Sequence, residues 1–228
     1  SADVVNITAS GSSVEKGETL VDTTRTLQAL GADIVIMRHG ASGAPYLVAR
    51  ELEASVINAG DGWHAHPTQA LLDLFTVQSR LGSIEGRRVA IVGDILHSRV
   101  ARSATWGFAT LGAHVVLCAP PTLLPTGFAD AVHTGLRAKG IDAACPVTVT
   151  HDAGEALRDA DVVMALRVQR ERMDAGLLPS LREYAREWGI TRERLAKARF
   201  GALVMHPGPM NEGVEITPEV AYGPQSVI

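Results

Sequence analysis

Short apolar runs alternate with helical stretches along this chain, and the alternation restricts its fold more than any other feature. Most runs are rich in β-branched residues and lead through a turn into a helical stretch. Strands that alternate with helices in this way lie parallel in a sheet, because each crossover helix returns the chain to the same sheet end. The runs predict strands at 4–7, 34–37, 55–58, 88–94, 114–119, 146–150, 161–166 and 202–205.

The stretch 58–74 begins as a turn and continues as a helix. Its glycines permit a chain reversal, and Pro67 suits the first turn of a helix. In that helix Leu71, Leu72 and Phe75 form an apolar stripe. His66 and Gln69 then lie near the helix N-terminus, where free N–H groups and the helix dipole favour an anion.

This helix divides the pattern into two halves. One series of strands and helices precedes it and a second series follows the turn at 82–88. We therefore expect an α/β fold with two doubly wound parallel-sheet domains joined by a connecting helix, and we place the domains at residues 1–67 and 68–228. The charged segment 173–197 is expected to be a long exposed loop with helical pieces.

Basic and amide side chains gather where the predicted strands end. In α/β proteins the carboxyl edge of the sheet is the edge where ligands bind. The candidates at this edge are Lys16, Arg38, His66, Gln69, Arg99, Arg167 and Gln169. No acidic residue is among them, so the set suits a pair of ligands that bear phosphate and carboxylate groups. We expect a cleft between the two sheets that these side chains share.

Taken singly, these residues have plainer interpretations that remain open. His66 precedes Pro67, a position typical of a helix cap. An ion pair with a surface carboxylate would explain Arg38 equally well, and the Gly- and Ser-rich loop around Lys16 would serve as a connector. Two prolines stiffen the loop 206–209, which makes its carbonyls fixed acceptors, although the same loop would also serve as a simple turn.

Composition and charge exclude several classes of protein. The 228 residues carry a net charge of −4 without a basic block, and 4% of them are aromatic, so we expect no nucleic-acid partner. No apolar run is long enough to cross a bilayer and no secretory signal is evident, so we expect no membrane partner and a cytoplasmic location. Cys118 and Cys145 form no disulfide framework, which fits a reducing compartment.

Common cofactor and catalytic motifs are absent. Gly93 is followed by Asp94 without a second nearby glycine, so the G-x-G-x-x-G pattern of dinucleotide sites is missing. The Lys16 loop lacks the Walker spacing, and the sequence has no G-x-S-x-G elbow. His64 and His66 have no Cys or carboxylate at ligand spacing. We therefore expect no cofactor and no metal.

Considered together and in order, these motifs resemble the catalytic chains of the aspartate carbamoyltransferase family. The motifs that carry the resemblance are 12–19, 37–39, 66–69, 93–99, 166–169 and 206–209. The resemblance implies transfer of the carbamoyl group of carbamoyl phosphate to L-aspartate, giving N-carbamoyl-L-aspartate and phosphate in de novo pyrimidine (UMP) biosynthesis. It also implies a homotrimer with shared active sites, and it leaves open a regulatory chain or a dihydroorotase as a further partner.

The resemblance also implies a role for each matching residue. Arg38 and His66 are the expected catalytic pair, because Arg38 would reach the phosphate and the carbonyl oxygen and His66 would polarise that oxygen. The residues expected to bind carbamoyl phosphate are Ser12, Arg38, His66, Gln69, Gly208 and Pro209. Those expected to bind aspartate are Lys16, Arg99, Arg167, Gln169 and Pro207. The neighbouring subunit would supply Ser12 and Lys16. Domain 1–67 would be a partial carbamoyl-phosphate-binding domain and domain 68–228 the aspartate-binding domain.

The sequence departs from the family pattern in three places. It lacks the Ser-Thr-Arg-Thr loop that grips phosphate and the final helix that returns to the first domain, so we expect a piece of a longer catalytic chain that by itself lacks tight carbamoyl phosphate binding. Glu212 stands where some relatives carry Arg.

The sequence leaves two alternatives to aspartate carbamoyl transfer. Ornithine carbamoyltransferases share the His-Pro-x-Gln motif, but they carry His-Cys-Leu-Pro where this chain has His-Pro-Gly-Pro at 206–209. The other alternative is a non-catalytic paralogue that acts as a binding or assembly partner. The intact set of Lys16, Arg38, His66, Arg99 and Arg167 argues against that interpretation.

Overall fold

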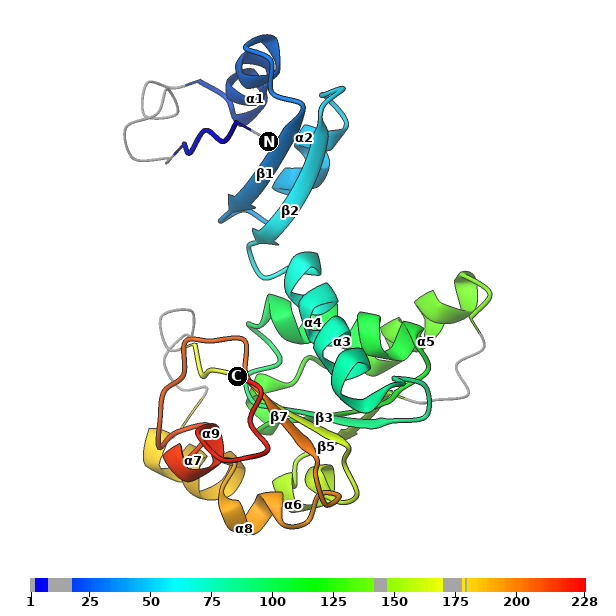
Figure 1. The fold of residues 1–228 in the computed structure, drawn as a ribbon, viewed down its shortest axis with the longest axis vertical. Coiled ribbons are helices and arrows are strands. Elements are labelled where there is room, and N and C mark those ends of the chain that lie inside the picture. The colour runs from blue at the N-terminus through cyan, green and yellow to red at the C-terminus, as the bar shows by residue number, and fades with distance from the viewer. Residues whose placement is uncertain (1–2, 8–17, 142–146, 170–177, 179) are drawn as a thin grey trace. The chain divides into compact units, whose positions relative to one another are not determined.

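The computed structural model describes residues 3–7, 18–141, 147–169, 178 and 180–228 (Figure 1). Ser12, Lys16 and Cys145 lie outside the described residues. The contacts divide the chain into two compact units, Ser1–His64 and Ala65–Ile228. Each unit has its own parallel sheet, which confirms the expectation of an α/β protein with two parallel-sheet domains.

The smaller unit is built around one pair of parallel strands. Its elements are α1 (Leu20–Ala29), β1 (Ile34–His39), α2 (Ala44–Ala49) and β2 (Ser55–Asp61). β1 and β2 pair in parallel, with Ile34 opposite Ser55. Thr19 caps α1 by accepting a hydrogen bond from the N–H of Asp22 at 3.2 Å.

The strand expected at 4–7 is wrong. Residues 4–7 have no strand conformation, and Val4 and Val5 expose 78% and 81% of their surface. An apolar β-branched run forms a strand only where a neighbouring strand pairs with its N–H and C=O groups. Within the described part of the chain, the sheet of this unit contains β1 and β2 alone.

The larger unit contains a five-stranded parallel sheet in the order β5-β4-β3-β6-β7. The strands are β3 (Arg88–Val92), β4 (His114–Cys118), β5 (Val147–Thr150), β6 (Val162–Ala165) and β7 (Leu203–Met205). The helices are α3 (Pro67–Leu81), α4 (Arg99–Thr110), α5 (Phe128–Ala138), α6 (Ala153–Leu157), α7 (Leu181–Trp188), α8 (Arg192–Leu195) and α9 (Pro218–Ala221), with a short 3₁₀ helix, η2 (Pro121–Leu123).

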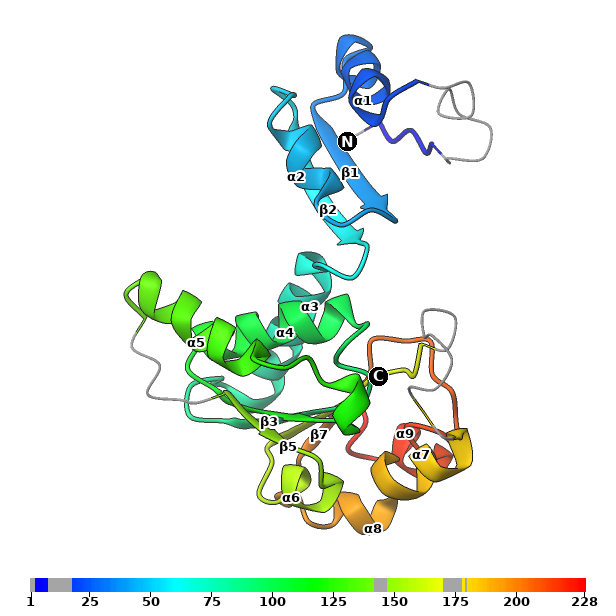
Figure 2. The same ribbon diagram turned by 180° about the vertical axis from the view of Figure 1, so that it is seen from behind.

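Helices cover both faces of this sheet. Alternate strand residues face opposite sides, so Val89 and Ile91 of β3 join one core cluster while Ala90 and Val92 join the other. The first cluster includes residues of α3, α4 and α5, and the second includes residues of α6, α8 and α9. Figures 1 and 2 show these two helix groups on opposite sides of the strands. The larger unit is therefore doubly wound.

The helix α3 packs against α4. Gly107 of α4 permits the close approach, because a Cβ atom there would lie 2.9 Å from Cδ1 of Leu74. The apolar stripe named from the sequence is exposed, since Leu71, Leu72 and Phe75 expose 65%, 57% and 70% of their surface. The helix has a second apolar stripe, formed by Leu74, Val77 and Leu81, which packs in the core. Helical periodicity alone does not decide which of the two stripes is buried.

The segment expected to be a long exposed loop contains buried structure. Tyr184 of α7 and Ile190 are 1% and 0% exposed, and the N–H of Ile190 donates to the carbonyl of Glu215 at 2.9 Å. In α7 the apolar side chains Tyr184 and Trp188 are one turn apart on a helix that is otherwise mostly charged. Because only a few apolar residues mark its buried side, the sequence pattern did not predict that this helix packs against the core.

Candidate active site

The order of strands in the larger sheet places the candidate site. The chain leaves β3 towards β4 on one side, and later crosses β3 to reach β6 on the other side. At such a reversal the loops after the two strands diverge and leave room for a ligand at the carboxyl edge. The loops after β3, β6 and β7 carry Arg99, then Arg167 and Gln169, then the segment 206–209. The fold thus brings these candidates to neighbouring strand ends.

Gly93 lets the ends of β3 and β6 meet closely. Its φ angle is 140°, and a Cβ atom there would lie 2.6 Å from the carbonyl oxygen of Leu166. The N–H of Leu166 donates to the carbonyl of Val92 at 2.8 Å. A residue with a side chain would strain the backbone and push the two strand ends apart.

The loop after β3 is held by a buried acid that the sequence analysis did not select. Asp94 accepts from the N–H of His97 at 3.1 Å, and its Oδ1 lies 2.9 Å from Nδ1 of the His97 ring. Burial raises the pKa of Asp94, while hydrogen bonds from His97 and from the backbone of Gln169 oppose the rise. The bond from Gln169 joins this loop to the loop after β6. The only sequence signal was an acid directly after an apolar strand.

Arg99 begins α4. Ser98 caps the helix by accepting from the N–H of Ala101 at 3.1 Å, and Arg99 is 8% exposed. The loop after β6 alternates in burial, with Arg167 and Gln169 half-buried on either side of the buried Val168. This alternation fits an extended segment in which Arg167 and Gln169 project to the same side.

His66 lies beside α4. Its N–H donates to Oγ of Ser103 at 2.8 Å, and Ser103 is one helical turn beyond Arg99 on the same face of α4. The ring of His66 also caps α3, because Nδ1 accepts from the N–H of Gln69 at 3.3 Å. The capping role left open by the sequence is therefore present. In the neutral ring this bond leaves the proton on Nε2.

Gln69 is held by a buried carboxyl group. Its Nε2 donates to Oδ1 of Asp73 at 3.0 Å, and Asp73 is 5% exposed. Burial raises the pKa of Asp73 from 3.8 to about 6, although the bond from Gln69 acts in the opposite direction. Sequence reasoning missed Asp73, because an acid in a helical pattern is normally a surface residue.

Arg38 belongs to the smaller unit. It lies near the end of β1, is exposed, and has no ion pair with a carboxylate within the described residues. The turn after β2 is organised by Asp61, which accepts from Gly43 N–H at 2.6 Å and from Asn58 Nδ2 at 2.9 Å. Burial alone would raise the pKa of Asp61, but hydrogen bonds from Asn58, Gly43 and His64 lower it.

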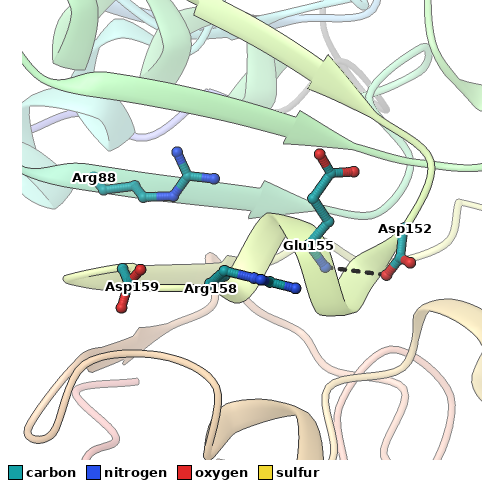
Figure 3. Close-up of a pocket in the computed structure, with 5 residues that line it drawn as sticks. All are labelled: Arg88, Asp152, Glu155, Arg158 and Asp159. Carbon is teal, nitrogen blue, oxygen red and sulfur yellow. Dashed lines mark hydrogen bonds between the residues drawn. The ribbon is translucent and has the colours of Figure 1, made fainter.

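Two cavities lie away from these candidates. One of about 600 Å³ opens between β3 and α6 (Figure 3) and is lined by Arg88, Asp152, Glu155, Arg158 and Asp159. Another of about 480 Å³ is lined by Ser180, Arg182, Glu183 and Arg186. Both have mixed charge and neither contains an expected site residue. Across the described ranges no group of three or more metal-ligating side chains occurs, and no helix is long and apolar enough to span a bilayer.

The fold and the strand-end residues define a doubly wound α/β protein with basic and amide side chains at its ligand-binding edge. The chain belongs to the aspartate/ornithine carbamoyltransferase family. Residues 1–79 match its carbamoyl-P binding domain and residues 85–228 match its Asp/Orn binding domain.

Similar proteins support the same family. The chain is 65% identical to the aspartate carbamoyltransferase catalytic subunit of Roseiflexus castenholzii, and the match covers 100% of this chain and 69% of that protein. Identity to the corresponding subunit of Chloroflexus aurantiacus is 62%, with 100% and 71% covered.

Solved structures have the same fold. Aspartate transcarbamoylase from Trypanosoma cruzi in complex with N-(phosphonacetyl)-L-aspartic acid matches with a TM-score of 0.82 and 32% identity, covering 97% of this chain and 68% of that one. Ornithine carbamoyltransferase from Pyrococcus furiosus matches with a TM-score of 0.81 and 28% identity, covering 93% and 65%.

Proposed function

We propose that the chain catalyses transfer of the carbamoyl group from carbamoyl phosphate to L-aspartate, giving N-carbamoyl-L-aspartate and phosphate in de novo pyrimidine (UMP) biosynthesis. The observation that carries the proposal is the 65% identity, over the whole chain, to an aspartate carbamoyltransferase catalytic subunit. The related Trypanosoma cruzi enzyme has been solved with carbamoyl phosphate and aspartate, and with carbamoyl aspartate and phosphate.

The reaction needs orientation and charge stabilisation more than an enzyme nucleophile. The aspartate amino nitrogen attacks the carbamoyl carbon, and negative charge develops on the carbonyl oxygen. The bond from that carbon to the phosphate oxygen then breaks, and the departing phosphate takes up the amine proton. Donors placed around the carbonyl oxygen lower the barrier because they stabilise charge as it forms.

Two side chains would stabilise the carbonyl oxygen in this proposal. His66 would donate to this oxygen from Nε2, since its Nδ1 accepts from the N–H of Gln69. The guanidinium of Arg38 would contact both the carbonyl oxygen and the phosphate. Gln69 would bind the carbamoyl group through the amide that Asp73 holds in place.

Aspartate would be bound at the carboxyl edge of the larger sheet. Arg99 and Arg167 each offer a planar fork of N–H groups that pairs bidentately with a carboxylate. Gln169 lies two residues beyond Arg167 and would contact the same substrate. The carbonyls of Pro207 and Gly208, in the loop closed by Pro209, would accept from the amino and carbamoyl N–H groups.

We extend the proposal to the assembly and location of the protein. It would be a cytoplasmic homotrimer in which Ser12 and Lys16 complete the active site of the adjacent subunit. The residues 1–67 would form part of the carbamoyl-phosphate-binding domain and the residues 68–228 the aspartate-binding domain. A regulatory chain or a dihydroorotase remains open as a further partner.

The proposal is tested by an assay of the complete protein that contains these residues. The assay supplies carbamoyl phosphate with either L-aspartate or L-ornithine. We expect carbamoyl-aspartate and no citrulline, because Arg99 and Arg167 suit a second carboxylate and repel an ammonium group. Citrulline formation would overturn the choice of substrate. Calorimetry with N-(phosphonacetyl)-L-aspartate separates an enzyme from a non-catalytic paralogue, because the paralogue would not bind this analogue of both substrates.

A further inference from the structure

A buried His–Glu pair lies beneath the loop after β7. The side chains of His206 and Glu215 are 0% and 1% exposed, and His206 Nε2 lies 3.3 Å from Glu215 Oε1. His206 opens the loop 206–209, and Glu215 follows its far end. Neither side chain points to a surface ligand, so the pair acts from inside the protein.

The hydrogen bonds of His206 define where its proton lies. Its Nδ1 accepts from the N–H of Gly208 at 2.9 Å, so this nitrogen carries a lone pair. In the neutral ring the proton is then on Nε2, which donates to Glu215 Oε1. The same oxygen accepts from the N–H of Asn211 at 2.5 Å. One carboxylate oxygen thus binds His206, where the loop begins, and Asn211, just beyond its end.

This arrangement sets the direction of the Pro207 carbonyl. Among the described residues the cis peptide bond is Gly208–Pro209, so the bond from Pro207 to Gly208 is trans. In a trans peptide the N–H and the C=O point in opposite directions. Because the N–H of Gly208 faces the buried ring of His206, the carbonyl of Pro207 faces away from that ring.

A purely stabilising role does not explain Glu215 well. Its second oxygen, Oε2, is buried and has no hydrogen-bond partner among the described residues, and the same is true of the Tyr184 hydroxyl. A buried polar atom without a partner costs about 1–3 kcal/mol. A well-packed apolar side chain at position 215 would avoid this cost. Stability alone therefore does not explain why a buried carboxyl group occupies this position.

We propose that Glu215 is a positioning residue: by accepting from Nε2 it holds the ring of His206 in place, and that ring, through its bond from the Gly208 N–H, aims the carbonyl of Pro207 at the amino group of aspartate. This inference rests on the proposed function. The amino nitrogen is the attacking atom, so its orientation controls the rate, and a displacement of about 1 Å at a positioning group costs about 100-fold in rate. Asn211 connects the same device to the loop after β6, because its Nδ2 donates to the carbonyl of Val168 at 3.4 Å.

Kinetics of two Glu215 variants in the complete protein test the role. Glu215→Met keeps the side-chain length but removes the acceptor, so we expect kcat to fall about 10- to 100-fold and the KM for aspartate to rise. The inhibition constant of inorganic phosphate should stay within about twofold of wild type, because backbone carbonyls do not bind an anion. Glu215→Gln keeps an acceptor oxygen and should restore most of the activity. Glu219→Met, an exposed change in the same segment, is the control and should behave as wild type.

A spectroscopic measurement tests the tautomer without any variant. Long-range ¹H–¹⁵N correlation spectra of the wild-type protein should show neutral His206 with its proton on Nε2. A proton on Nδ1 in the wild type would overturn the inference, even if Glu215→Met does not fold.

The kinetic outcomes separate this inference from the proposed function. A wild type that forms carbamoyl-aspartate, with Glu215→Met unchanged or with Glu215→Gln damaged as severely as Glu215→Met, overturns the positioning role alone. A wild type that forms no carbamoyl-aspartate overturns the proposed function, and the positioning role in that reaction falls with it.

Discussion

At the scale of single residues, Asp73 combines burial with a carboxyl group that ionises near neutrality. The pKa of this group is raised from 3.8 to about 6 because it is removed from water. The folded protein therefore binds the proton more tightly than the unfolded chain does. The stability that Asp73 contributes is fully present below pH 3.8 and is lost as the pH rises to about 6.

We expect Asp73→Asn to stabilise the protein at pH 8 and to have little effect at pH 4. The difference between 3.8 and about 6 corresponds to about 3 kcal/mol as an upper bound. The amide of Asn keeps an oxygen that accepts from Gln69, so the contact survives. Urea unfolding of both proteins at pH 4, 6 and 8 measures the effect. Equal stability changes at all three values would show that ionisation of Asp73 has no part in it.

Arg38 and Arg99 belong to different substrates in the proposed site, so their removal should have different effects. Arg38→Ala should weaken carbamoyl phosphate binding and lower kcat, whereas Arg99→Ala should mainly raise the KM for aspartate. Each change removes a charge-assisted hydrogen bond worth about 1.5–3 kcal/mol, or about 10- to 100-fold. Steady-state kinetics with each substrate varied in turn gives both numbers. The role assignment fails if the two variants impair both substrates alike.

At the scale of elements, the contact between the ends of β3 and β6 depends on Gly93. Gly93→Ala should destabilise the protein by more than about 3 kcal/mol, because both its φ of 140° and the 2.6 Å approach to Leu166 exclude a side chain. Activity should fall with it, since the loops that carry Arg99 and Arg167 would move apart.

Gly86→Ala is the matched control for Gly93→Ala. Gly86 also has a positive φ, 72°, but a Cβ atom there meets nothing within 4 Å. It should cost only about 1–2 kcal/mol and leave the KM values unchanged. Thermal unfolding and aspartate kinetics compare the two variants, and equal losses would mean that backbone strain, rather than the close approach, explains Gly93.

The strands that the sequence located best are those with continuous apolar runs and turns on both sides. β3, β4 and β6 are buried on both faces and left an unbroken signal, as β3 shows from Val89 to Val92. The run at 4–7 is also rich in β-branched residues, but it has no strand beside it among the described residues. The β-propensity of a segment depends on its own residues, whereas a strand also needs an adjacent strand to pair with. Composition alone does not reveal whether that adjacent strand is present.

The same distinction applies to the candidate site. Arg99, Arg167 and the loop 206–209 were predictable because they follow apolar strands, and strand ends meet at one edge. Asp94 and Glu215 were not, because a buried acid and a surface acid look alike in a sequence. Their partners, such as His206 for Glu215, become apparent only when the fold brings distant segments together.

At the scale of the whole molecule, α3 presents an apolar patch of Leu71, Leu72 and Phe75 that nothing covers within the described residues. Contiguous exposed apolar surface favours association. We expect a protein of residues 1–228 to bind a hydrophobic dye and to self-associate, and the double change Leu72→Ser and Phe75→Ser to reduce both. Dye fluorescence and analytical ultracentrifugation measure the effect.

Phe200 provides the control for the α3 patch. It is fully exposed but stands apart from the patch on α3, so Phe200→Ser should change dye binding and association little. If Phe200→Ser reduces association as much as the double change does, the association is a non-specific effect of exposed apolar residues and does not depend on the α3 patch.

The reversal of strand order between β3 and β6 has a consequence during synthesis on the ribosome. The proposed aspartate-binding edge draws on the loops after β3, β6 and β7, which come from early, middle and late parts of the larger unit. A growing chain halted before β7 would lack the loop 206–209 and therefore one part of the proposed site. We therefore expect activity only after β7 has paired with β6 and Glu215 has reached His206.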